Sequence, residues 1–250
     1  MSIRICHFLL IAFIIDGISF LPKVRGQENR GGIKVFTKGF ASCSASFFDS
    51  VRDKFDISIK NNVFLMVLKS DYSDFSYFFS KAFKPQGVLS IEFSNFNNEK
   101  IKKMEGMFSS CENLKEIKGL ADFDTSKITN MAYLFNGCKS LSSISISSFE
   151  TSSVTNMNKM FFNCSSLLYL DISNFNLKNI ISADDIFEGI NNLEYLDISK
   201  VKNGIAYIIN SPFNHIDNLT ICQNEEFINN PKTARKCCFW MIEKHMCFIP

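Results

Sequence analysis

Hydrophobic positions recur at a nearly constant step along the middle of the chain. A block of the form Met-x-x-Met-Phe-x-x-Cys-x-x-Leu begins at Met104 and returns at Met131 and Met157, with a weaker copy at Ala183. The repeat is counted on its phenylalanines, which are Phe108, Phe135, Phe161, Phe187 and Phe213. Repetition at such a step predicts a repeat architecture, in which one unit cannot bury its apolar face alone and neighbouring units stack over a shared core.

Each unit has two halves with different hydrophobic periods. The first half, for example 157–164, places apolar residues at i, i+3, i+4 and i+7, which predicts a helix of about two turns. The second half, for example 167–172, has the pattern Leu-x-x-Leu-x-Ile, whose last positions alternate as a short β-strand requires. The step from Phe108 to Phe135 is longer by one position than the steps that follow, and this extra residue, near Gly119, predicts a bulge.

The two halves together resemble a known family. The pattern Leu-x-x-Leu-x-Ile is similar to the strand signature of leucine-rich repeats. The Met-x-x-Met-Phe-x-x-Cys-x-x-Leu block at 26-residue spacing resembles the BspA-type leucine-rich repeat surface proteins of bacteria and parasitic protists. The resemblance covers residues 88–222. It implies an α/β repeat fold, a right-handed leucine-rich-repeat solenoid with a parallel β-sheet on one face and short helices on the other.

One departure from ordinary leucine-rich repeats concerns the asparagine expected shortly after each strand. Phenylalanine replaces it at four successive positions, namely Phe96, Phe123, Phe149 and Phe175. A stacked aromatic spine is therefore expected where a ladder of side-chain hydrogen bonds would otherwise run. Val201 breaks this series in the next unit, so the repeat degrades toward its C-terminal end.

The ends of the chain differ from the repeats. Arg4 precedes the apolar stretch 5–15, which is too short to span about 30 Å of hydrocarbon but suits a signal peptide over residues 1–26. Cleavage is expected after Ser19 or Gly26, and a buried N-terminal strand is the alternative. An irregular N-terminal cap is expected over 27–87. In one interpretation, part of this stretch is a further, degenerate repeat. A C-terminal cap is expected over 223–250. No later segment is a candidate membrane span, so the sequence predicts a secreted or cell-surface protein.

Composition narrows the function classes. The chain has 27 basic and 25 acidic residues, a net charge of +2 and no basic run, which argues against a nucleic-acid partner. With three histidines in the whole chain and no phosphate-binding, zinc-protease or nucleophile-elbow motif, we expect no enzyme, no cofactor and no metal site.

The cysteines fall into two groups. Cys111, Cys138 and Cys164 share one repeat position that isoleucine takes in weaker copies, so they are expected to act as apolar fillers, with a disulfide between successive units as the alternative. Four others cluster past the last repeat and predict a disulfide-stapled cap, with a zinc site that uses His245 as the alternative. These four are Cys222, Cys237, Cys238 and Cys247.

The outward positions of the strand halves form columns that are candidates for ligand binding. Stacked tyrosines beside stacked aspartates would make a recognition patch, although tyrosine and serine also simply suit exposed strands. The candidate residues are Tyr169, Tyr195, Asp171, Asp197, Glu116 and Lys118. Two glycosylation sequons, at Asn163 and Asn218, also stand out in an exported chain.

The family resemblance implies protein–protein binding at a surface, in particular adhesion to host cells or extracellular matrix proteins. The alternative is a structural surface-coat component that self-associates and has no foreign ligand. A secreted hydrolase is the third class, and it lacks a recognisable nucleophile and base.

Overall fold

The structure is a computed structural model that describes residues 32–38, 44–68, 72–96, 98–201, 203 and 219–222. The signal peptide predicted over 1–26 and the C-terminal cap predicted over 223–250 lie outside these residues. So do four candidate site residues, namely Cys237, Cys238, Cys247 and Asn218.

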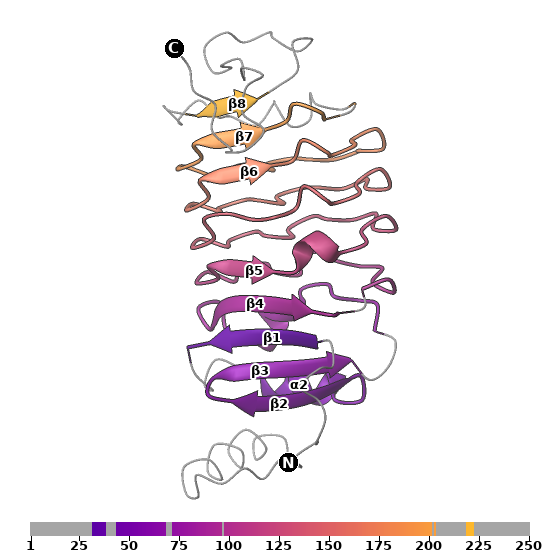
Figure 1. Ribbon diagram of the computed structural model, residues 1–250, viewed down its shortest axis with the longest axis vertical. Helices are drawn as coiled ribbons and strands as arrows, with labels where there is room; N and C mark the ends of the chain where they lie inside the picture. The colour runs from indigo at the N-terminus through magenta and orange to yellow at the C-terminus, as the bar shows by residue number, and fades with distance from the viewer. Residues whose placement is uncertain are drawn as a thin grey trace, which may run out of the picture.

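Two β-sheets run along the described chain (Figure 1). The first has the order β2-β3-β1-β4-β5, and the second has the order β6-β7-β8. The strands of the first sheet are β1 (Gly32–Thr37), β2 (Phe55–Lys60), β3 (Val63–Leu68), β4 (Val88–Ser94) and β5 (Glu116–Lys118). Those of the second sheet are β6 (Tyr169–Asp171), β7 (Tyr195–Asp197) and β8 (Thr220–Cys222). The first sheet is mixed, because only β4 and β5 pair in parallel, whereas the second is parallel throughout.

Three short helices accompany the strands in the described residues. They are α2 (Ala45–Val51), α3 (Phe78–Ala82) and the 3-10 helix η2 (Leu120–Asp122). The hydroxyl of Ser44 caps α2 by accepting a hydrogen bond from the Phe47 N–H at 3.4 Å. The stretch expected to be an irregular N-terminal cap thus contains three antiparallel strands and two helices, and it adds directly to the first repeat strand, β4.

In the units that begin at Met104, Met131, Met157 and Ala183, the first half, which we call the turn half, contains no helix where one was predicted. Each such segment instead contains two residues in the left-handed region, four positions apart, such as Tyr133 with φ 59° and Gly137 with φ 73°. The next unit has Lys159 at 54° and Asn163 at 56°. A right-handed helix cannot continue through such residues, so the chain forms successive tight turns.

Backbone hydrogen bonds show what replaces the helix. In the unit that begins at Met131, the N–H of Tyr133 donates to the carbonyl of Asn158 in the next unit at 2.8 Å. The following N–H, from Leu134, donates three residues back to Met131 at 3.3 Å. This alternation continues along the segment, so every second amide joins neighbouring units. The i, i+3, i+4, i+7 spacing still directs the apolar side chains inward, but it does so without a helix.

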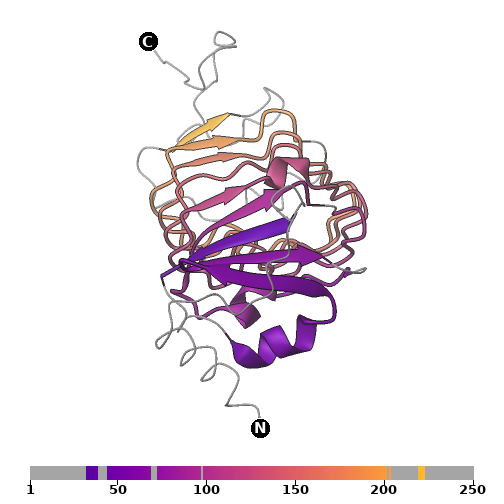
Figure 2. The ribbon, with the colours of Figure 1, turned by 60° about the horizontal axis from the view of Figure 1, so that its bottom comes forward.

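The predicted fold class is therefore wrong. The regular elements of the described residues are mostly strands in a mixed and a parallel sheet, with few short helices, and they do not resemble a leucine-rich-repeat solenoid with helices on one face. The units lie one above another in chain order along the long axis, from purple strands at one end to orange and yellow strands at the other (Figure 1). The same order is visible when the molecule is tilted (Figure 2).

A stack of phenylalanine rings runs through the core of these units. Neighbouring ring centroids are 5.2, 5.4, 5.6 and 5.8 Å apart, and their planes differ by 14° at most. The rings belong to Phe79, Phe108, Phe135, Phe161 and Phe187. In the series where an aromatic spine was expected, Phe96 stacks on Phe123 at 6.1 Å. The continuous stack therefore occupies the turn half of each unit.

Buried polar side chains form a hydrogen-bond ladder at another repeat position. The Thr125 hydroxyl donates to the Glu150 carbonyl at 3.0 Å and accepts from the Glu150 N–H at 2.8 Å. Thr151 and Asn98 each make an equivalent pair of contacts with the backbone one unit later. Because each polar group is paired, its burial costs little and it ties one unit to the next.

The extra residue of the longer first step lies in η2 and its glycine cap, where a bulge was predicted. Gly119 has φ 82°, and a Cβ atom there would lie 2.2 Å from the carbonyl oxygen of Phe93. Glycine is therefore required both by backbone conformation and by the close approach of β4.

Candidate functional site

The candidate binding residues lie on the outward side of three strands, which we call the strand face. It comprises Glu116, Lys118, Tyr169, Asp171, Tyr195 and Asp197. The parallel register of β6 and β7 places Tyr169 beside Tyr195 and Asp171 beside Asp197. The leucine between each Tyr and Asp points the other way and is fully buried.

Tyr169 and Tyr195, which we call the Tyr pair, stack on each other on the strand face. Their ring centroids are 4.7 Å apart and their planes differ by 3°. In-register parallel strands lie about 4.8 Å apart, so equivalent side chains can stack directly. The column continues on both sides, because Tyr169 pairs with Ser143 and Tyr195 pairs with Thr220.

The two aspartates hold the turns that follow their strands. Asp171 Oδ1 accepts from the Ser173 N–H at 2.9 Å, and Asp197 Oδ1 accepts from the Ser199 N–H at the same distance. The Tyr195 hydroxyl donates to Asp197 Oδ2 at 3.3 Å. One oxygen of each carboxylate is thus engaged in a local turn, which gives these residues a structural role beside any contact with a ligand.

Glu116 and Lys118 are not brought together with the Tyr pair. They lie on β5, at the end of the first sheet, and form an exposed ion pair of 3.4 Å with each other. One repeat unit, which contains Ser143, separates them from β6. The strand face therefore has an acidic and basic part on the first sheet and an aromatic part on the second.

A charged contact that sequence reasoning missed lies beside Lys118. Lys34 on β1 donates to Glu92 on β4 at 2.7 Å, and Ser94 donates to the same oxygen at 3.3 Å. The hydrogen bond from Lys34 lowers the pKa of Glu92, and the charge of Lys118 acts in the same direction. No sequence pattern pairs Lys34 with Glu92, and only the long-range pairing of β1 with β4 supplies the partner of Lys34.

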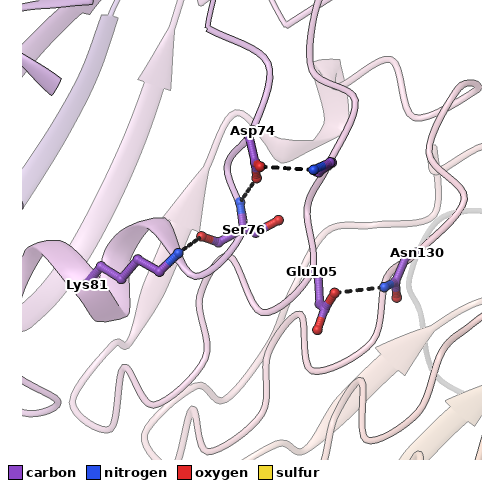
Figure 3. A network of polar contacts seen from close by, with 6 residues as sticks. Asp74, Ser76, Lys81, Glu105 and Asn130 are labelled. Atoms are coloured by element: carbon purple, nitrogen blue, oxygen red, sulfur yellow. Dashed lines mark hydrogen bonds and ion pairs between the residues drawn. The ribbon is translucent and has the colours of Figure 1, made fainter. Parts of the chain in front are cut away.

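A second polar network lies on the turn side of the units (Figure 3). Asp74 accepts from the Ser76 N–H at 3.0 Å and lies 3.3 Å from the Lys103 ammonium group. Lys81 donates to the Ser76 carbonyl at 3.0 Å. These contacts join α3 and the first turns to the unit that follows.

Glu105 links three units in the same network. Its carboxylate accepts from the Asn130 side-chain amide at 2.9 Å (Figure 3). It also accepts from the Tyr77 hydroxyl at 2.9 Å. Burial and the adjacent carboxylate raise the pKa of Tyr77 to about 12. The Tyr77 ring lies directly over Gly106, where a Cβ atom would come within 2.3 Å of it.

The three repeat cysteines are free and buried, as expected for apolar fillers. The Cys138 thiol donates to the Phe108 carbonyl at 3.2 Å, and the Cys164 thiol donates to the Phe135 carbonyl at 3.1 Å. Burial raises the pKa of Cys111 and of Cys164 to about 12 and that of Cys138 well above its usual value. These thiols are therefore protonated and poorly reactive in the folded protein.

Cys222 differs from these three. It is disulfide-bonded, and its Sγ lies 3.1 Å from the hydroxyl oxygen of Tyr195, next to the Tyr pair. The sequon residue Asn163 is exposed in a tight turn with φ 56°.

The described residues contain neither a candidate membrane-spanning helix nor a candidate metal-binding cluster. No helix there is long and apolar enough to cross a lipid bilayer. No group of three or more His, Cys, Asp or Glu side chains in this part of the chain could hold a metal ion.

Comparison with known protein families gives a match to the stacked units. A family model described as "Mycoplasma protein of unknown function, DUF285" matches residues 73–201, just over half of the chain. The matched range begins at the unit that contains Phe79 and ends at Val201, so it coincides with the stacked units. No curated protein and no solved structure matches the chain significantly. The chain therefore belongs to the family described as Mycoplasma protein of unknown function, DUF285.

Proposed function

We propose that the protein is a secreted or cell-surface binding module that recognises a protein ligand through the strand face. The stacked Tyr pair is the observation that carries this proposal. Tyrosine supplies a large contact area and a polar tip at low cost in conformational entropy, and it is enriched at the energetic centres of protein interfaces.

The Tyr pair is organised before any ligand arrives. Parallel pairing of β6 with β7 sets the ring spacing, and the hydroxyl of Tyr195 is held by Asp197 and lies beside the Cys222 sulfur. A side chain already ordered in the unbound protein loses less entropy on binding, so such a surface binds more tightly than a mobile one.

The resemblance to BspA-type surface proteins suggests host cells or extracellular matrix proteins as the source of the ligand. That suggestion is an analogy at the level of the family, since a fold and a repeat do not specify a ligand. The alternative is a surface coat that self-associates. It is favoured by β2, the outermost strand of the first sheet, because an edge strand can pair with another chain.

The test compares the full chain with a Tyr169→Ala/Tyr195→Ala variant on an array of immobilised extracellular matrix proteins and on intact host cells. We expect saturable binding by the native chain and a loss of about thirtyfold or more in affinity in the variant, the size typical of interface hot spots. A Lys178→Ala variant, altered at an exposed position outside the strand face, is the control and should bind as well as the native chain. Native binding that survives loss of both tyrosines would contradict the assignment of the site.

A further inference from the structure

Strand β2 is the outermost strand of the first sheet. It pairs with β3 on one side, and in the part of the chain that the structure describes no strand pairs with its other side. An edge strand presents backbone N–H and C=O groups along its outer side, and these groups can pair with another chain.

The hairpin that joins β2 to β3 determines which residues face outward. Its two central residues, Asn61 and Asn62, have φ values of 49° and 63°, as in the two-residue turns that favour hairpins. In such a hairpin the flanking pair, Lys60 and Val63, is hydrogen-bonded, and bonded and non-bonded pairs then alternate. The backbone groups of Ser58 and Asp56 therefore point toward β3, and those of Ile57 and Ile59 point toward the outer edge.

The sequence of β2 is self-complementary in the antiparallel direction. Around Ser58 it reads Asp56-Ile57-Ser58-Ile59-Lys60, with opposite charges at equal distances from the centre. If two copies align antiparallel about Ser58, Asp56 of each copy faces Lys60 of the other. Ile57 then faces Ile59, and these are the residues whose backbone groups point outward.

We propose that two copies of this chain pair antiparallel through β2, centred on Ser58. The backbone groups of Ile57 and Ile59 form the hydrogen bonds between copies, and two Asp56–Lys60 ion pairs set the register. Ser58 and Lys60 are exposed, whereas Ile57 and Ile59 are partly buried against the core on the inner face of the sheet. Pairing therefore extends one continuous sheet with its apolar side chains inward and its charged side chains outward.

Charge complementarity favours a second copy of this chain as the occupant. Opposite charges face each other in both halves of the paired strands, and like charges there would oppose association. The joined sheets present two strand faces in one particle, which raises the effective affinity for a multivalent surface. The pairing does not depend on the Tyr pair, so the two proposals succeed or fail separately.

The first test is a charge reversal on the full chain, followed by sedimentation over a wide range of protein concentrations. Native protein should form a dimer. Asp56→Lys or Lys60→Asp alone places like charges opposite each other and should raise the dimer dissociation constant about tenfold or more. The double variant Asp56→Lys/Lys60→Asp restores opposite charges and should recover the dimer. Lys178→Asp, at an exposed position in a later unit, is the matched charge control.

The second test uses a cysteine at the symmetry centre. Opposed Ser58 residues form a non-hydrogen-bonded pair with Cα atoms about 4.5 Å apart, a distance suited to a disulfide. Ser58→Cys should therefore form a covalent dimer on mild oxidation, whereas Ser143→Cys, exposed on the strand face, should not. This variant leaves both charges in place, so it remains informative if a charge reversal impairs folding.

The proposal is overturned by a native chain that stays monomeric at all concentrations. It is equally overturned if the single charge reversals leave the dimer dissociation constant unchanged, or if the double reversal does not restore the dimer that the single reversals weaken. Equal cross-linking of Ser58→Cys and Ser143→Cys would also contradict it.

Discussion

At the scale of single residues, side chains in one unit bind to residues of the neighbouring units. Glu105 is engaged from both sides, by Tyr77 in the preceding unit and Asn130 in the following one. Thr125 and Thr151 make equivalent contacts to the backbone inside the core. A residue in this protein is therefore stabilised mainly by partners that lie one repeat unit away in the sequence.

Burial of Tyr77 and its contact with Glu105 predict a pH dependence of stability. The folded-state pKa of Tyr77, about 12, lies above its usual value of 10.0, so this environment stabilises the fold fully below pH 10. This contribution is lost as the pH rises from 10 through about 12, because the unfolded chain releases the proton more readily.

Tyr77→Phe should remove this pH dependence and reduce the free energy of unfolding by about 1 kcal/mol at neutral pH, through loss of one hydrogen bond. Urea unfolding of both proteins at neutral pH and at several values above pH 9 provides the measurement. Native and variant curves that fall in parallel over the alkaline range would refute the assignment.

At the element scale, tight turns replace the expected helices. The apolar spacing of 131–138 is that of an amphipathic helix, yet Tyr133 and Gly137 adopt left-handed conformations there. A left-handed non-glycine residue costs about 1 kcal/mol, and hydrogen bonds to the neighbouring unit offset it. The same turns stack the phenylalanine rings that form the core.

The glycines of these elements differ in what they require, which predicts different costs of substitution. In Gly137→Ala the only expected strain is that of an alanine in the left-handed conformation, since its Cβ would lie 3.6 Å from the nearest neighbouring atom, on Ser110. We expect a loss of about 1 kcal/mol in unfolding free energy. In Gly119→Ala the new Cβ would also lie 2.2 Å from the Phe93 carbonyl oxygen, so the loss of unfolding free energy should be clearly larger. Chemical denaturation measures both, and an equal or smaller loss at Gly119 would disprove the explanation.

At the scale of the whole molecule, the stacked units make stability approximately a sum over neighbours. The same contacts recur in successive units, as in the hydrogen bonds from the Phe108 N–H to the Leu134 carbonyl and from the Phe135 N–H to the Met160 carbonyl. Removing one whole unit should therefore preserve the register of all the others.

Deletion of residues 141–166 joins Ser140 to Leu167, which occupies the position of Leu141 one unit later. We expect this variant to fold cooperatively with a lower melting temperature, because one interface between units is lost. Deletion of 141–160 breaks the register and should prevent cooperative folding. Thermal unfolding followed by circular dichroism distinguishes the two, and a cooperative transition only in the shorter deletion would contradict the stacked arrangement.

Several features follow from the sequence alone, because they depend only on which side chains recur at which step. The repeat period, the buried Met, Phe and Cys positions and the shared columns of the strand residues are of this kind. The spacing of apolar side chains does not determine where the backbone N–H groups find their acceptors. Only the neighbouring unit decides that, and it converts the expected helices into turns. Tertiary structure likewise decides the antiparallel pairing of β1 with β4 and the Lys34–Glu92 contact, since each depends on segments far apart in the chain.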